Sequence, residues 1–209
     1  MKKFLLLFLL WKVAVGAENS DFTIPYQNAV VAYKSGDYPA AKTAALEAGK
    51  RGGEDLRPSL LLGKIALAQK NYREAESLIA PLIQKNPDNP MLWMPWGDTL
   101  VFLGKPGKAI NFYEKASHVD AQKPDALLRK VYAFLKNQER GEAERITAAM
   151  DGFNDKTPVY YFAKAAVLDA SGKKPEADVV LKNARTLYGE TVYLDYYREY
   201  LWFIGSPLK

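Results

Sequence analysis

Residues 56–89 read LRPSLLLGKIALAQKNYREAESLIAPLIQKNPDN, and this stretch decides the fold. Apolar side chains recur three and four residues apart on both sides of a short turn at Lys70–Tyr72. This spacing is typical of two helices that each bury one face. A single helix pair leaves an apolar face uncovered, so such a unit is stable only when others stack against it.

The same arrangement returns along the chain with a period of 34 residues and needs no insertion or deletion. The units begin near residues 22, 56, 90, 124 and 158. A fixed period of this length is typical of stacked helical repeats. One small residue marks the frame in every unit: Ala41, Ala75, Ala109, Ala143 and Ala177.

The second unit resembles the tetratricopeptide repeat (TPR) family, and the likeness extends from residue 22 to about residue 190. The columns that match in the second unit are Leu62, Gly63, Ala66, Tyr72, Ala75, Ile79, Leu82 and Pro87. Those of the third unit are Trp93, Gly97, Gly104, Ala109, Tyr113 and Ala116. The resemblance implies an all-α, right-handed superhelical solenoid of about five helix-turn-helix repeats over residues 18–190, followed by a C-terminal capping helix and tail over residues 191–209.

Residues 1–17 have the layout of a signal peptide. Two lysines precede an apolar run from Phe4 to Trp11, and small residues end at Ala17. Eight apolar residues are too few to cross a bilayer, so we expect cleavage after Ala17, no stable membrane span afterwards, and a periplasmic or secreted bacterial protein. The alternatives are an uncleaved N-terminal anchor and a buried first helix.

Composition argues against several classes of function. Cleavage would leave 26 basic residues against 24 acidic ones, a net charge of about +2, which is not the footprint of a nucleic-acid-binding protein. The chain has no cysteine and one histidine, His118, so we expect no metal site. The acids are expected on solvated helix faces, and glycines lie in repeat turns rather than in a phosphate loop. We therefore expect no cofactor, no catalytic residue and no enzyme.

In the TPR family the first helix of each unit lines a concave groove that binds a protein partner. By that resemblance the lining here is mostly apolar and aromatic: Tyr26, Tyr33, Leu60, Lys64, Leu67, Met94, Asp98, Phe102, Leu128, Tyr132, Leu135 and Phe162. The cations with which some family members bind a terminal carboxylate are replaced here by Tyr26, Val30, Leu61, Met91 and Pro95. We expect an exported scaffold that binds a partner segment, suited to assembly of an envelope, secretion or pilus machine.

Residues 191–203 hold four tyrosines, a tryptophan and a phenylalanine. In the repeat frame Asp195, Arg198 and Glu199 would point into the core, so this segment is not a sixth repeat. As a helix it carries two apolar stripes, and we expect the one with Leu194 and Leu201 to cap the fifth unit. The other side chains are predicted to face a partner, a second copy or the groove end: Tyr193, Tyr196, Tyr200, Trp202 and Phe203.

Two further functions stay open at this point. One is a structural solenoid that self-associates into a homo-oligomer through its exposed aromatic end. The weaker one is an envelope enzyme that acts on peptidoglycan from a helical scaffold. Two prolines are also expected to disturb their helices, because proline lacks a backbone donor. Pro81 predicts a kink, and Pro95 predicts a helix that begins late or bends.

Overall fold

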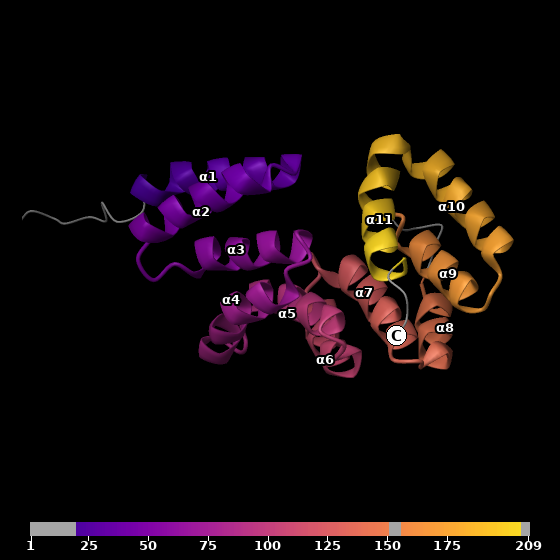
Figure 1. Ribbon diagram of the computed structural model, residues 1–209. Helices are drawn as coiled ribbons and strands as arrows, with labels where there is room; N and C mark the ends of the chain where they lie inside the picture. Colours follow the sequence, from indigo (N-terminus) through magenta and orange to yellow (C-terminus); the bar gives the residue numbers. More distant parts are fainter. Residues whose placement is uncertain (1–19, 151–155, 206–209) are drawn as a thin grey trace, which may run out of the picture. The chain divides into compact units, whose positions relative to one another are not determined.

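The computed structural model describes residues 20–150 and 156–205, and within them it has eleven α-helices and no strand (Figure 1). The predicted all-α fold is confirmed. The expected signal peptide at residues 1–17 lies outside the described residues. The helices are α1 (Ser20–Ser35), α2 (Tyr38–Arg51), α3 (Leu56–Ala68), α4 (Tyr72–Lys85), α5 (Pro90–Phe102), α6 (Pro106–Ser117), α7 (Lys123–Lys136), α8 (Arg140–Ala148), α9 (Val159–Ala170), α10 (Lys174–Tyr188) and α11 (Glu190–Phe203).

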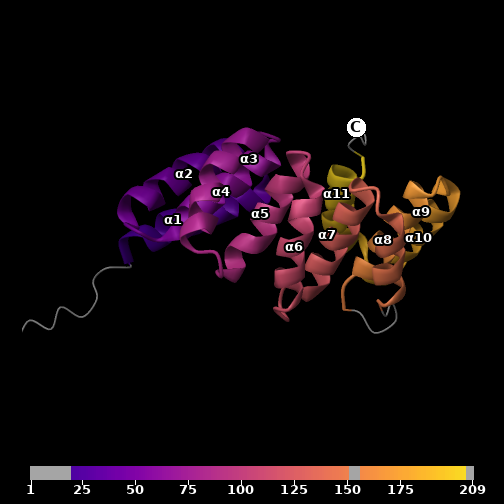
Figure 2. The ribbon, with the colours of Figure 1, turned by 90° about the horizontal axis from the view of Figure 1, so that it is seen from below.

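The chain forms two compact bodies, an N-terminal body of residues 1–61 and a C-terminal body of residues 62–209, and α3 crosses the boundary between them. In the N-terminal body α1 packs against α2. The Arg57 guanidinium lies over the ring of Phe22, 5.0 Å from its centre, and also binds Asp55 at 2.6 Å. In the C-terminal body α5 packs on α6, α6 on α7, and α9 on α10, so neighbours in the chain are neighbours in space (Figure 2).

The repeat frame explains why the helices approach so closely. The five alanines that mark it are fully buried. A methyl group added at Gly63 would lie 2.5 Å from Ile79 Cγ1, and one added at Gly97 would lie 2.5 Å from Tyr113 Cε1. Both glycines therefore stand where the second helix of their unit presses a large side chain against the backbone of the first.

The turn inside each unit keeps the same period through its backbone conformation. One residue per turn has a positive φ, between 62° and 82°, in the left-handed region that ends helices. Three of these residues are glycines, for which the conformation is free of strain, and two are not. In chain order they are Gly36, Lys70, Gly104, Gln138 and Gly172.

Prolines do not shorten the helices as expected. The late start predicted for the helix with Pro95 is wrong, because α5 begins at Pro90 and runs past Pro95 without a break. Its start is fixed by the side chain of Asn89, which accepts a hydrogen bond from the Met91 backbone at 3.0 Å. Pro81 also lies inside a continuous helix, α4, and the kink expected there stays a prediction.

Candidate functional site

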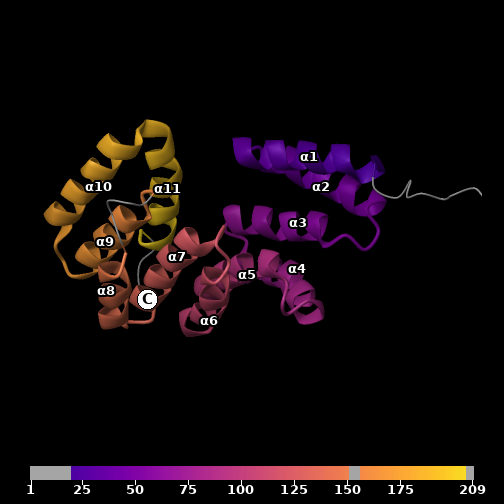
Figure 3. The same cartoon turned by 180° about the vertical axis from the view of Figure 1, so that it is seen from behind.

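The helix α11 does not continue the stack. The chain turns at Gly189, whose φ is 79°, and α11 then lies beside α7 and α9 in the C-terminal body (Figures 1 and 3). Its side chains contact α5, α7 and α9, the first helices of three successive repeats. We call the residues that receive it the docking face, and they are Asp98, Phe102, Asp125, Arg129, Tyr132, Phe162 and Asp169.

One end of α11 is held by stacked rings. Trp202 stacks on Phe102 with ring centres 4.2 Å apart, and Tyr72 stacks on Phe102 at 4.9 Å. Phe203 lies 4.9 Å from Phe102 and 5.2 Å from Tyr132 and is fully buried. Aromatic pairs at these distances contribute about 0.5–1.5 kcal/mol each beyond the area that they bury. This end of α11 is therefore anchored mainly by apolar contact.

The other end combines ring contacts with hydroxyl groups. Phe162 lies 5.7–5.9 Å from three tyrosine rings of α11. Tyr196 donates a hydrogen bond to Asp125 at 2.8 Å, and Tyr200 donates one to Asp169. Burial raises the pKa of both hydroxyls, and the adjacent carboxylates raise it further. Both tyrosines therefore stay neutral donors, and their acceptors fix how far α11 is shifted along its axis.

A buried charged cluster lies between these two ends. Arg129 donates hydrogen bonds to Asp98 of α5 and, at 2.9 Å, to Glu199 of α11. The exposed fractions of the three side chains are 15%, 8% and 21%. Asp98 also accepts a hydrogen bond from the buried Tyr113 hydroxyl at 2.8 Å. Burial raises the pKa of Glu199, and Arg129 offsets this only in part because one guanidinium serves two carboxylates.

The fit of α11 leaves hydrogen-bonding capacity unused. Three buried polar atoms at this interface have no partner among the described residues: Arg129 Nε, Glu199 Oε1 and the Tyr132 hydroxyl. A buried polar group left without a partner costs about 1–3 kcal/mol. The docking face therefore holds α11 firmly through rings but incompletely through polar contacts.

The prediction that the leucine side of α11 caps the fifth repeat is wrong, whereas its aromatic side lies against the predicted groove residues Phe102, Tyr132 and Phe162, one of the alternatives left open for that side. Leu201 is 48% exposed and Leu194 is 36% exposed, whereas Tyr200 and Phe203 are buried. The reason is that α11 turns back over the first helices instead of capping α10 with its leucines. There the rings of Phe102 and Phe162 and the charge of Arg129 favour the aromatic side of α11.

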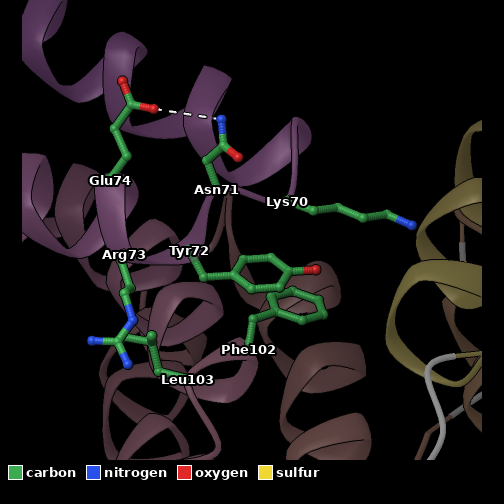
Figure 4. Close-up of a pocket in the computed structure, with 7 residues that line it drawn as sticks. All are labelled: Lys70, Asn71, Tyr72, Arg73, Glu74, Phe102 and Leu103. Atoms are coloured by element: carbon green, nitrogen blue, oxygen red, sulfur yellow. Dashed lines mark hydrogen bonds between the residues drawn. The ribbon is translucent and has the colours of Figure 1, made fainter.

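An open depression adjoins the stacked rings of Trp202, Phe102 and Tyr72. Its cavity volume is about 620 Å³, and Tyr72 and Phe102 stack along it while Lys70 extends toward α11 (Figure 4). Asn71 and Glu74 lie on one side, 3.5 Å apart between Nδ2 and Oε2. Its seven lining residues are Lys70, Asn71, Tyr72, Arg73, Glu74, Phe102 and Leu103. Two cations thus flank an aromatic surface next to the end of α11.

The residues predicted to line the groove divide into several groups. Asp98, Phe102, Tyr132 and Phe162 belong to the docking face. Tyr26, Tyr33 and Leu60 lie in the N-terminal body, while Lys64 is exposed on α3. Met94 is half-buried against the core. Three further leucines are buried in helices of the C-terminal body: Leu67, Leu128 and Leu135.

Sequence reasoning missed Arg129, although a signal was present. Arg129 stands 34 residues after Pro95 and 68 after Leu61, in the same repeat column. The earlier units hold no cation in that column, and the expectation of a groove without a carboxylate-binding cation rested on them. The placement of all acids on solvated faces is also wrong, because Asp98 is buried against Arg129.

The chain's one histidine lies at the surface beside a glutamate. His118 is 76% exposed, 3.5 Å from Glu114. No group of three or more His, Cys, Asp or Glu side chains is arranged to hold a metal ion in the parts of the chain that the structure describes. None of the helices described is long and apolar enough to cross a membrane.

Several solved structures share the fold. A thermophilic TPR protein of Thermus thermophilus superposes with a TM-score of 0.70 at 20% identity, covering 86% of this chain and 96% of that one. PilF of Pseudomonas aeruginosa gives 0.58 at 17% identity over 86% and 82% of the two chains. MamA of MSR-1 gives 0.57 at 19% identity over 79% and 95%. No curated protein sequence matches the chain significantly.

The sequence itself carries the family signature in its first repeats. Residues 26–94 match the tetratricopeptide repeat family, in agreement with the 34-residue frame and with the solved structures. Residues 26–94 therefore carry the tetratricopeptide repeat signature, and the chain as a whole has the fold of a solved TPR protein.

Proposed function

We propose that this chain is a protein-interaction scaffold whose docking face receives an amphipathic helix bearing a carboxylate and aromatic rings. The observation that carries the proposal is α11 itself, a helix of this kind held by Arg129 and by the rings of Phe102, Tyr132 and Phe162. A helix laid with its apolar side into a complementary surface is a recurrent mode of peptide recognition.

The chemistry of the docking face suits recognition of a helix. Rings bury much area at a low cost in side-chain entropy, and aromatic residues and arginine are enriched among the residues that dominate binding energy. Asp125 and Asp169 add acceptors for two hydroxyl donors, and these donors stand one helical turn apart on α11. Together these groups select both the kind of side chain and its spacing along a partner helix.

Site-specific photocrosslinking in the cells that make the protein tests the proposal. A photoreactive phenylalanine analogue replaces Tyr72, beside the docking face, and in a matched control it replaces the exposed Lys182 of α10. We expect a defined protein adduct from position 72 and none from position 182. Equal adducts from both positions, or none from either, would contradict a partner at this face.

A second candidate function is self-association, and the outer side of α11 favours it. Leu194 and Leu201 stand seven residues apart and are both exposed, so they share one side of the helix. We propose that this side joins two copies at high concentration. Light scattering on the purified chain and on the Leu194→Glu, Leu201→Glu variant tests it, because a dimer must dissociate in the variant. A monomer in both would eliminate self-association.

We also propose that the scaffold acts after export, in the assembly of an envelope, secretion or pilus machine. The support is the pattern of Lys2, Lys3, the apolar run and Ala17 in the sequence. N-terminal sequencing of the protein recovered from its own cells decides this point. Export with cleavage gives Glu18 as the first residue, whereas retention of Met1 would refute cleavage.

A further inference from the structure

We infer that α11 is a displaceable intramolecular ligand, and that a helix from another protein takes its place on the docking face. That partner carries a carboxylate followed three and four residues later by aromatic side chains, the spacing of Glu199, Trp202 and Phe203. It also carries acidic residues beyond the aromatic pair. This inference rests on the proposed function, because it assigns the partner's chemistry and the regulation of the same face.

The way α11 is attached favours displacement. It joins α10 through Gly189, a single residue with a φ of 79°, and no side chain caps its first turn. Its aromatic side lies on the docking face, whereas Leu194 and Leu201 are exposed, and its first turn also forms an ion pair with α10 between Glu190 and Arg185. A helix held through its aromatic side and linked by a glycine turn can leave without unfolding the repeats, because the repeat helices pack on one another independently of it.

The docking face offers a competitor contacts that α11 does not make. Arg129 Nε and the Tyr132 hydroxyl are buried at the interface and have no partner among the described residues, and neither has Glu199 Oε1. A helix with an added acceptor for Arg129 would satisfy a group that α11 leaves unpaired. Side-chain chemistry alone can therefore make an external helix fit better than the internal one.

The open depression defines what lies beyond the aromatic pair. Phe102 belongs both to the docking face and to the depression, and Trp202 stacks on it at the end of α11. Lys70 and Arg73 line the same depression (Figure 4). A partner whose chain continues past the aromatic pair can place carboxylates in this depression, where two cations attract them.

A separate protein is a better occupant than a second copy of α11. The internal helix is tethered by one residue, so its effective concentration at the docking face is in the millimolar range. The same helix on another copy makes identical contacts without that advantage. Only a helix with additional contacts outcompetes the tethered one, and the unpaired polar atoms and the two cations provide them.

A lockable form of the full chain tests displacement. The protein has no cysteine, so the Asp125→Cys, Tyr196→Cys variant carries one reactive pair across the interface between α7 and α11. A short, cleavable thiol-to-thiol crosslinker then holds α11 in place. The probe is a fluorescent peptide with the sequence of residues 190–204 followed by three glutamates, and the control peptide carries Glu199→Lys and Phe203→Ala.

We expect the probe to bind the unlocked protein at least ten times more tightly than the locked one, and cleavage of the crosslinker to restore binding. The control peptide is expected to bind neither form. Equal binding to both forms would overturn displacement and leave the scaffold function to the Tyr72 crosslinks. Binding to neither form, or equal binding of both peptides, would overturn the assigned partner chemistry. An exchanged dimer of the unlocked protein would identify a second copy as the occupant and overturn the assignment to a separate protein.

Discussion

Phe203 and Leu201 provide a direct test of how α11 is oriented. They lie two residues apart on the same helix, yet Phe203 is fully buried and Leu201 is 48% exposed. The sequence alone favoured the opposite assignment, with the leucine side in the core. Replacing each by alanine therefore separates the two orientations within one helix.

The expected magnitudes differ several-fold. Phe203 contacts the rings of Phe102, Tyr132 and Trp202, with centres 4.9–5.4 Å away, and lies near the Arg129 guanidinium. Truncating a buried phenylalanine to alanine costs about 3–5 kcal/mol because contacts are lost and a cavity remains. For Leu201 the surface substitution is expected to stay within about 0.5 kcal/mol.

Native-state hydrogen exchange resolves this difference at the level of one helix. The loss in Phe203→Ala is limited to the free energy that docks α11, so its amides should lose protection while those of α5 and α7 keep theirs. Leu201→Ala should leave protection of α11 close to wild type. Urea unfolding of both variants gives the change in global stability.

Equal loss of protection in the two variants would refute this orientation of α11. Uniform loss of protection in α5 and α7 together with α11 would instead contradict independent docking of α11, because α11 would then be part of one cooperative core. In that case the helix could not exchange with a partner while the repeats stay folded.

Three further predictions address the charges and turns. Burial raises the pKa of Glu199, so the docked state should lose stability as pH rises from about 4.5 through the raised pKa. In Glu199→Gln the stability of the docked state should not change over that pH range. Parallel curves of stability against pH for the variant and the wild type would contradict the raised pKa. Lys70→Gly should gain about 1 kcal/mol in urea unfolding by relieving its positive φ, and a loss would argue against strain there. Gly97→Ala should cost about 1–3 kcal/mol through overpacking, whereas Gly141→Ala, with open space around it, should gain up to about 1 kcal/mol; similar effects would refute the close approach.

The repeat fold could be predicted because its signal is repeated in every unit. Ala41 and its four equivalents are small where helices touch, so each unit supplies independent evidence for the same frame. The turn residues add a signal that residue type alone hides. Lys70 and Gln138 take the left-handed conformation of Gly36 because the register of the stack imposes it.

The docking face was harder to predict, since it joins residues far apart in sequence. Asp98, Arg129 and Glu199 are separated by 31 and 70 residues, and no period relates α11 to the repeats. Helical periodicity shows that α11 has two apolar sides but not which side is buried. That choice depends on a cation in a column where the earlier repeats have Gln27, Leu61 and Pro95, and on a turn at Gly189 that reverses the chain.

A face of this composition does not remain empty in water. Without α11, the rings of Phe102, Tyr132 and Phe162 would be exposed and the apolar area now buried would be lost. If a partner takes this face, as proposed, it must bind by exchange, and its apparent affinity then falls by the fraction of molecules in which α11 is undocked. If α11 docks with about 3 kcal/mol, that fraction is about 1 in 150, so a partner of intrinsic nanomolar affinity would bind at roughly 150 nM. Weakening α11 at Phe203 should then tighten partner binding while it lowers the stability of the helix, two opposite effects that follow from one displaced side chain.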